Sequence, residues 1–228
     1  MIDHAHDLAS VQEATDRLLT AVAKLDNASV ARPSRLPGWT VGHVLAHLAR
    51  NADALTNVLG GRPMYVSGEA RDADIERDAP RPLDAQLADL RESEARFRAR
   101  AAEPADWTRT VELRNGVTDA AARVPFRRWA EVELHHVDLG IGYELEDLPE
   151  EFKEREIDFL ADRFLAHSDV PATRITDGTR AWSTGRQASR PEVTVTGRPA
   201  DLLGWLAGRR PGAALEVSGG PLPALPPL

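Results

Sequence analysis

The sequence predicts an α+β protein in which a four-helix bundle precedes a small α/β domain. Before residue 147, apolar residues recur at the spacing of one helix face in four long segments. After residue 148, short β-branched runs that end at glycine alternate with helical segments. We therefore predict a helical domain over residues 1–147 and an α/β domain over residues 148–228. The boundary falls in the acidic segment ELEDLPEEFKE, which contains Pro149.

Each helix of the first domain is predicted from apolar residues on one face. The four helices are expected over residues 6–25, 41–59, 82–102 and 122–143. Thr40 is a predicted N-cap of the second helix, and Gly60 lies near its C-cap. Four consecutive helices favour an antiparallel bundle.

Two connecting segments of this domain have their own signals. Residues 62–80 are polar, acidic and poor in periodicity, so we expect a long loop there. Residues 107–120 are expected to form a short hairpin around the Asn115-Gly116 dipeptide.

The second domain is predicted to begin with a helix over residues 151–167. Strands are expected in the runs ATRITDG, RAWSTG, PEVTVTG and AALEVSG, and a short amphipathic helix in RPADLLGWLAGRR. The tail GPLPALPPL is expected to be extended.

Composition excludes several classes of function. The net charge of -8, from 36 acidic and 28 basic residues, opposes binding to nucleic acid, which requires a basic surface. No apolar run approaches the roughly 18 residues that a membrane span needs. The N-terminus MIDHAHDLASVQ has no basic segment followed by an apolar one, so we expect a cytoplasmic protein.

The chain contains no cysteine. Disulfides, cysteine metal ligands and a thiol nucleophile from the protein are therefore excluded. A metal would have to be held by histidine and carboxylate, and any thiol chemistry would need a small molecule that carries the sulfur.

The segment RRWAEVELHHVDLG, residues 127–140, is the most informative part of the chain. Glu131 and His135 lie four residues apart, on one face of the predicted helix, and Asp138 follows one turn later. Apolar residues surround them on all sides of the helix, so the helix is expected to be buried. A buried carboxylate is costly unless it is paired or bound to a metal.

The second predicted helix offers a further histidine. His47 borders its apolar face and is expected to point inward, whereas His43 is expected to point toward solvent. His47, Glu131 and His135 together would form the three-ligand shell of a catalytic zinc site with an open position. An internal ion pair of Glu131 with Arg128 or His135 would explain the same pattern without a metal. Glu133 and His136, on the same helix, compete for the inward positions.

Longer stretches resemble a known family. LPGWTVGHVLAHLARNADAL (residues 36–55), RRWAEVELHHVDLGIGY (127–143) and VTGRPADLLGWLAGR (195–209) resemble the mycothiol-dependent maleylpyruvate isomerase family, which belongs to the DinB-like four-helix metalloproteins. The resemblance covers nearly the whole chain. It implies a DinB-like bundle that binds a metal and a sterol-carrier-like C-terminal domain that closes over the metal.

The resemblance also implies roles for individual residues. The family's zinc ligands fall on His47, Glu131 and His135, and supporting residues on Asn51, Asp53 and Asp138. An arginine of the second domain is expected to hold the substrate carboxylate. Arg209 is the candidate for this role, with Arg210 and Arg198 as alternatives.

The implied chemistry is a cis–trans isomerisation. Mycothiol would supply the thiolate, which adds to the double bond of maleylpyruvate, allows rotation and is then eliminated to give fumarylpyruvate. A mycothiol S-transferase acting on another electrophile and a non-catalytic metal-binding bundle are the alternatives. The ligand set also suits iron or nickel, and either a monomer or a homodimer is compatible with the sequence.

Overall fold

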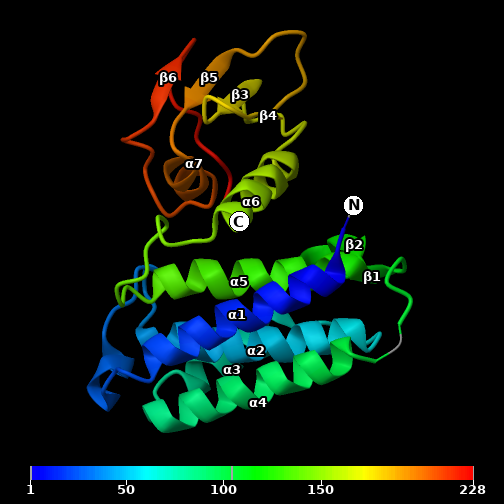
Figure 1. Cartoon of the computed structure of the whole chain (residues 1–228), viewed down its shortest axis with the longest axis vertical. Helices are drawn as coiled ribbons and strands as arrows, with labels where there is room; N and C mark the ends of the chain where they lie inside the picture. The colour runs from blue at the N-terminus through cyan, green and yellow to red at the C-terminus, as the bar shows by residue number, and fades with distance from the viewer. Residues whose placement is uncertain (1, 104, 228) are drawn as a thin grey trace. The chain divides into compact units, whose positions relative to one another are not determined.

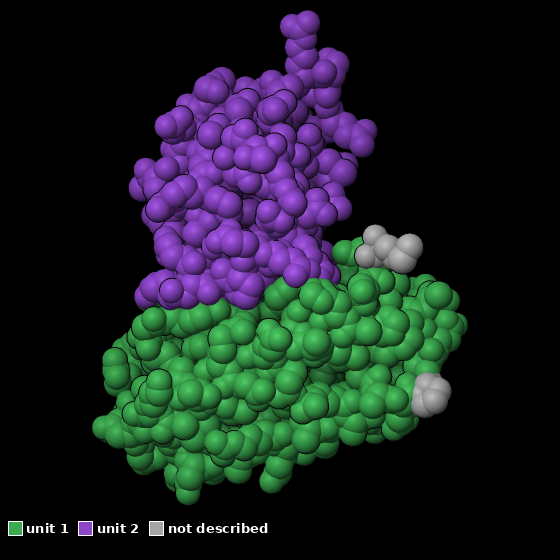
Figure 2. Space-filling view, in the orientation of Figure 1, with its two compact units in different colours: residues 1–143 green, residues 144–228 purple. Residues whose placement is uncertain are grey.

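The computed structural model describes residues 2–103 and 105–227 and divides the chain into two compact units. They are Met1–Tyr143 and Glu144–Leu228 (Figure 2). The first unit is helical and the second contains a four-stranded sheet, so the predicted fold class is confirmed. None of the helices in the described part of the chain is long and apolar enough to cross a membrane.

The first unit is built around four long helices (Figure 1). In chain order they are α1 (His4–Val22), α2 (Val41–Leu59), α4 (Leu83–Ala101) and α5 (Val124–Asp138). Helix α1 packs on α5, and α2 packs on both α4 and α5. Helix α2 therefore lies at the centre of the unit, where its apolar residues are buried over nearly its whole length.

Helix α2 has the bounds that the sequence predicts, because both of its ends are capped. The Thr40 side chain accepts a hydrogen bond from the His43 backbone N–H, and His43 Nδ1 accepts one from the Thr40 N–H, completing a capping box. Gly60 is the C-cap. His43 thus caps the helix, with its side chain 17% exposed, rather than standing in solvent.

A fifth helix corrects the sequence prediction of a loop over residues 62–80. Helix α3 covers Gly68–Asp78, and the Ser67 side chain caps it by accepting from the Ala70 N–H. Only Ile75 and Asp78 of this helix are buried. Apolar periodicity is therefore too weak to reveal the helix in the sequence.

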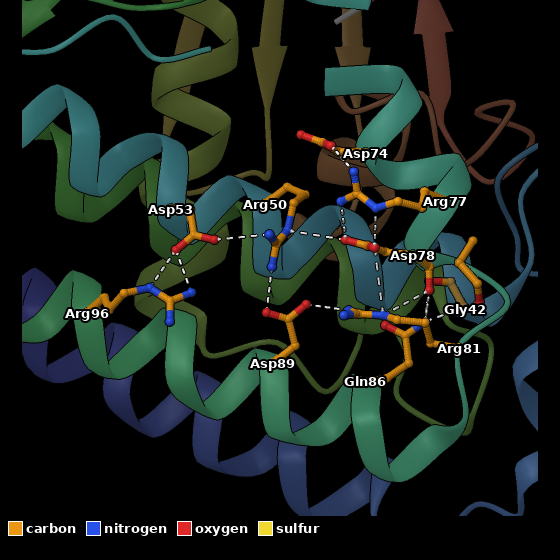
Figure 3. A network of polar contacts seen from close by, with 11 residues as sticks. Gly42, Arg50, Asp53, Asp74, Arg77, Asp78, Arg81, Gln86, Asp89 and Arg96 are labelled. Carbon is orange, nitrogen blue, oxygen red and sulfur yellow. Dashed lines mark hydrogen bonds and ion pairs between the residues drawn. The ribbon is translucent and has the colours of Figure 1, made fainter. Parts of the chain in front are cut away.

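Ion pairs, rather than apolar residues, attach α3 to α2 and α4 (Figure 3). Asp78 pairs with Arg77 at 3.0 Å and lies 3.9 Å from Arg50 of α2, and Arg50 in turn pairs with Asp89 of α4 at 2.5 Å. Gln86 of α4 donates to the backbone oxygens of Asp78 at 2.8 Å and of Ala79 at 3.1 Å. The C-terminal end of α3 is thereby fixed against its neighbours.

Gly42 allows this close approach. A Cβ at this position would lie 2.0 Å from the Ala79 backbone oxygen, so a larger residue would separate α2 from the end of α3.

The predicted hairpin is confirmed. Strands β1 (Thr110–Glu112) and β2 (Thr118–Ala120) pair antiparallel, with Val111 opposite Asp119. The turn is the short 3-10 segment η2 (Arg114–Gly116), in which Asn115 and Gly116 both have positive φ. Two further 3-10 segments, η1 (Asn27–Ala31) and η3 (Ala121–Arg123), connect the helices.

Helix α5 is shorter than the predicted range of residues 122–143. It ends at Asp138, and Gly140 follows with a φ of 66°. The left-handed backbone at this glycine terminates the helix. The apolar residues beyond it, which extended the predicted pattern, belong to the following turn.

The second unit is a small α/β fold. Its helices are α6 (Glu150–Arg163) and α7 (Pro199–Leu206), and its strands are β3 (Thr173–Thr176), β4 (Ala181–Thr184), β5 (Val193–Thr196) and β6 (Glu216–Ser218). The strand order is β4-β3-β5-β6, with β3 parallel to β5 and the other pairs antiparallel. Helix α6 contacts both α7 and β4. All four predicted strands and both predicted helices are present.

Candidate metal centre

Helices α2 and α5 bring together the three residues that the sequence indicates as metal ligands. One side-chain atom each of His47, Glu131 and His135 lies within 4.8 Å of the other two. Oε2 of Glu131 lies 3.0 Å from His47 Nε2 and 3.3 Å from His135 Nε2. The two imidazole rings meet edge to face, with centroids 4.6 Å apart. Three potential ligand atoms therefore converge on one point.

The phases of the two helices produce this convergence. His47 lies on the buried face of α2, and its side chain is 7% exposed. Glu131 and His135 lie one turn apart on α5, where it packs against α2. The positions of all three side chains are thus fixed by regular helices, which hold a site more rigidly than loops do.

The charges in the cluster suit a divalent cation. Burial lowers the pKa of His47 to about 4, so its imidazole is neutral at pH 7. Burial would raise the pKa of Glu131, but hydrogen bonds with His135 and His47 outweigh it and hold that pKa well below its ordinary value. A neutral imidazole and an ionised carboxylate are the forms that bind metals.

Asp138 supports the second histidine. Its Oδ2 lies 2.8 Å from His135 Nδ1, and its side chain is fully buried. Burial opposes the charged form of His135, but the hydrogen bonds with Asp138 and Glu131 prevail and raise its pKa. A carboxylate on the far nitrogen of a metal-binding imidazole fixes its orientation and directs the other nitrogen toward the metal.

The structure gives Asn51 and Asp53 other partners. Asn51 Oδ1 accepts a hydrogen bond from Arg128 Nη1 at 2.9 Å. Asp53 pairs with Arg96 at 2.8 Å and with Arg50 at 3.4 Å (Figure 3). These contacts join α2 to α5 and α4, so they explain both side chains without reference to a metal.

The structure also corrects the expectation that Glu131 is deeply buried. Its side chain is 33% exposed, whereas that of Glu133, two residues later, is 1% exposed. Arg128 does not form the alternative ion pair with Glu131, because its donors bind Glu94, the Leu48 backbone oxygen and Asn51. The alternative pair between Glu131 and His135 is present, and it belongs to the same cluster.

Two residues next to the cluster were not indicated by the sequence. Arg71 of α3 places Nη2 3.2 Å from His47 Nδ1, and its guanidinium carbon lies 5.9 Å from the centre of the Tyr65 ring. Burial and the charge of Glu131 raise the pKa of Tyr65. Both residues lie in the segment that was expected to be a loop. Without an apolar pattern there, the sequence could not indicate which way their side chains point.

The arginines proposed for substrate binding lie in the second unit. Arg209 Nη1 donates to the Ala207 backbone oxygen at 2.7 Å. Arg210 pairs with Glu146 and Asp201, and Arg198 pairs with Asp201.

The donor set fits a divalent metal. Two imidazole nitrogens and one carboxylate oxygen are the ligands of many catalytic zinc sites, which keep a further position open. The partial exposure of Glu131 is consistent with such a position. The ligand types do not select zinc over iron or nickel.

Comparisons with known proteins agree with this architecture. Residues 11–140 match the family model of the mycothiol maleylpyruvate isomerase N-terminal domain, and residues 147–227 match that of the MDMPI C-terminal domain. Two crystal structures match 99% of this chain over 97% of their own chains. One, of the mycothiol-dependent maleylpyruvate isomerase, has 27% identity and a TM-score of 0.89. The other, of a histidine-to-alanine mutant of that isomerase, has 26% identity and a TM-score of 0.88. No curated protein sequence matches the chain.

Proposed function

The chain belongs to the mycothiol maleylpyruvate isomerase family, and we propose that it is a zinc- and mycothiol-dependent cis–trans isomerase. Its substrate would be maleylpyruvate or a similar unsaturated dicarboxylate, and its product fumarylpyruvate or the corresponding trans isomer. The convergence of His47, Glu131 and His135 carries the proposal. The cytoplasmic location and the choice between monomer and homodimer stay predictions.

The residues of the first unit would each have a defined task. His47 and His135 would present Nε2, and Glu131 would present Oε2, to one metal ion. Asp138 would keep the proton of His135 on Nδ1, which leaves the Nε2 lone pair free for coordination. When bound, the metal would supply Lewis acidity and lower the pKa of a coordinating thiol.

The family resemblance supports mycothiol as the source of the thiol. The chain has no cysteine, which is compatible with a thiol that arrives on this small molecule. Its thiolate would form a C–S bond with one alkene carbon, and the alkene electron pair would move into the conjugated carbonyl. The former double bond could then rotate. Elimination would break the C–S bond, restore the double bond in the trans form and release the thiolate unchanged.

An arginine of the second unit would orient a substrate carboxylate. Arg209 remains the proposed residue on the basis of the family resemblance, with Arg210 and Arg198 as alternatives. Arginine suits this role because its planar fork matches a carboxylate. Closure of the second unit over the metal is likewise part of the proposal.

Metal content of the untagged protein is the first test. We expect one zinc ion per chain in the wild type and its loss in His47→Ala and Glu131→Ala, with the helical circular-dichroism spectrum retained. His43→Ala is the matched control, because it removes a histidine one turn earlier on the same helix that is not part of the cluster. A wild type that takes up no stoichiometric zinc, even when zinc is supplied, would contradict the proposal.

Turnover distinguishes the isomerase from a transferase. Zinc-loaded protein is mixed with maleylpyruvate and a small amount of mycothiol, and both fumarylpyruvate and free thiol are followed. An isomerase forms many equivalents of product at constant thiol. Consumption of one thiol per product would instead identify an S-transferase.

A further inference from the structure

Arg71 is a largely buried cation at the edge of the metal centre. Its side chain is 11% exposed, and Nη2 lies 3.2 Å from His47 Nδ1. Its carboxylate partner is Asp72, at 2.5 Å, whose own side chain is 61% exposed. The Arg71 fork is thus divided between an imidazole and an exposed acid, with the Tyr65 side chain as a further partner, and these contacts can be exchanged for a different acceptor.

The hydrogen-bond polarity of this contact is fixed by chemistry. A guanidinium has donors only, so His47 Nδ1 must accept from Arg71, and the ring hydrogen must lie on Nε2. In that tautomer Nε2 donates to Glu131 Oε2, at 3.0 Å. In this tautomer the ring hydrogen occupies Nε2, the His47 atom that faces Glu131. His47 therefore cannot bind a metal through Nε2 until that hydrogen has moved.

Coordination through Nε2 reverses this polarity. The lone pair is then needed at Nε2, and the ring hydrogen moves to Nδ1, where it faces an N–H of Arg71. Two donors at hydrogen-bonding distance repel each other. Arg71 must therefore give up His47 and find an anionic acceptor once a metal is held.

The backbone of α3 is held in place during such a change. Asp78 and Ala79 fix its C-terminal end to α4 through Gln86, and Asp78 also lies 3.9 Å from Arg50 of α2 (Figure 3). Arg71 lies nearly two turns earlier on the same helix. Its side chain can therefore change partner while its Cα stays close to the cluster.

Tyr65 connects Arg71 to a nearby cavity, although Arg71 itself is not among the residues that line it. Tyr65, over whose ring the Arg71 guanidinium lies, also lines a cavity of about 580 Å³ between residues 58–68 and the β1–β2 hairpin. Arg62, Arg109 and Arg114 line the same cavity together with Glu112, so the charged residues of its lining are mostly basic. A cationic lining of this kind favours an anionic molecule over a neutral one.

We propose that Arg71 is a substrate-binding residue that exchanges His47 for a carboxylate of the unsaturated dicarboxylate when the metal is in place. This inference rests on the proposed function, and it assigns the carboxylate contact to a residue of the same unit as the metal ligands. Arg71 would therefore bind one carboxylate whether or not an arginine of the second unit binds the other.

The test uses Arg71→Gln and Arg71→Lys in the full-length protein, with Arg91→Gln as the matched control. Arg91 is an exposed arginine of α4, so its loss reproduces the change in net charge alone. Zinc affinity is measured by competition with a chromophoric chelator. We expect Arg71→Gln to bind zinc about threefold or more tightly than the wild type, because a cation that opposes the metal is removed.

Binding of succinate to the zinc-loaded proteins is the second readout. Succinate is a dicarboxylate without a double bond, so its affinity reports binding alone. We expect Arg71→Gln to bind succinate about tenfold more weakly than the wild type, and Arg71→Lys to show an intermediate loss. The KM for maleylpyruvate should rise by about the same factor in each variant, with a smaller change in kcat. Arg71→Lys keeps the charge, so it gives a reading even if the glutamine variant folds poorly.

The outcomes separate this inference from the proposed function. If Arg71→Gln bound zinc and succinate as tightly as Arg91→Gln does, the proposed role of Arg71 would be overturned. This holds whether or not the protein is an active isomerase. Normal zinc binding without isomerisation would overturn the proposed reaction, whereas a loss of succinate binding in Arg71→Gln would still support the carboxylate contact. A wild type that binds no zinc would overturn both.

Discussion

Two glutamates of α5, only two residues apart, have opposite surroundings. Glu133 is 1% exposed and accepts from Arg17 Nη2 at 2.5 Å, Trp129 Nε1 at 3.1 Å and Tyr143 Oη at 2.8 Å. Glu131 is 33% exposed and contacts two imidazoles, one of which is neutral at pH 7. One carboxylate is saturated by donors of the protein, and the other is not.

The difference separates a structural carboxylate from a proposed metal ligand. Arg17 lies on α1, so its pairing with Glu133 joins α1 to α5 and leaves no oxygen for an external cation. Around Glu131 the neighbouring imidazole nitrogens can exchange a hydrogen for a metal ion. Burial and charge alone would have pointed to the wrong glutamate.

The largest expected effect comes from replacing the saturated carboxylate. In metal-free protein, Glu133→Gln should lower the free energy of unfolding by about 2–3 kcal/mol, since it leaves a cation and two further donors without their anionic acceptor. The loss is below that of a fully buried pair because Arg17 is 39% exposed. Urea titration measures it.

Glu131→Gln is the matched control for this experiment. In metal-free protein it should change the free energy of unfolding by less than about 1 kcal/mol, because Glu131 is itself 33% exposed and pairs with imidazoles rather than with a guanidinium. Equal losses in the two variants would show that the surroundings of the two glutamates do not differ in the way described.

A smaller effect is expected from the residue that supports His135. Asp138→Asn should weaken zinc binding by about 10–100-fold, because the amide no longer fixes the imidazole as a carboxylate does. Asp53→Asn is the control, since Asp53 pairs with Arg96 and Arg50 instead. Chelator competition that finds the same zinc affinity in both variants would remove Asp138 from the metal centre.

The elements with a strong apolar pattern were predictable from the sequence. Helix α2 has its predicted bounds because its inward residues repeat regularly and both caps are recognisable. Helix α3 was missed because charged side chains, not apolar ones, attach it to its neighbours, and charged side chains have no characteristic period. Arg71 was missed with it.

The same reasoning explains which site residues could be found. His47 has a defined phase on α2, and the four-residue spacing of Glu131 and His135 places both on one face of α5. The sequence could not show which of Glu131 and Glu133 is the more deeply buried, because α5 is apolar on nearly every side. It also could not show that Asn51 faces Arg128, since that contact depends on how two helices pack.

The smallest expected effect concerns a third carboxylate, in the second unit. Glu146 pairs with Arg210 through both of its oxygens, at 2.8 and 2.7 Å, yet its side chain is 46% exposed. Hydrogen bonds from Arg210 lower the pKa of Glu146 from 4.5 to about 2. It is thus saturated like Glu133 but lies at the surface, so its comparison with Glu133 isolates the contribution of burial.

The sign of the pH dependence follows from the lowered pKa. Because the folded state holds the proton less tightly than the unfolded state, the ion pair stabilises the fold fully above pH 4.5, and this contribution is lost as the pH falls toward 2. Solvent screening should limit it to less than about 1 kcal/mol.

Glu146→Gln should therefore reduce the free energy of unfolding at neutral pH. The same substitution should also reduce the loss of that free energy on acidification, as measured by urea titration at neutral pH and at about pH 3. Glu216→Gln, an exposed carboxylate on β6, is the control. If Glu146→Gln matched this control at both pH values, the pair with Arg210 would contribute nothing, and burial alone would account for the effect at Glu133.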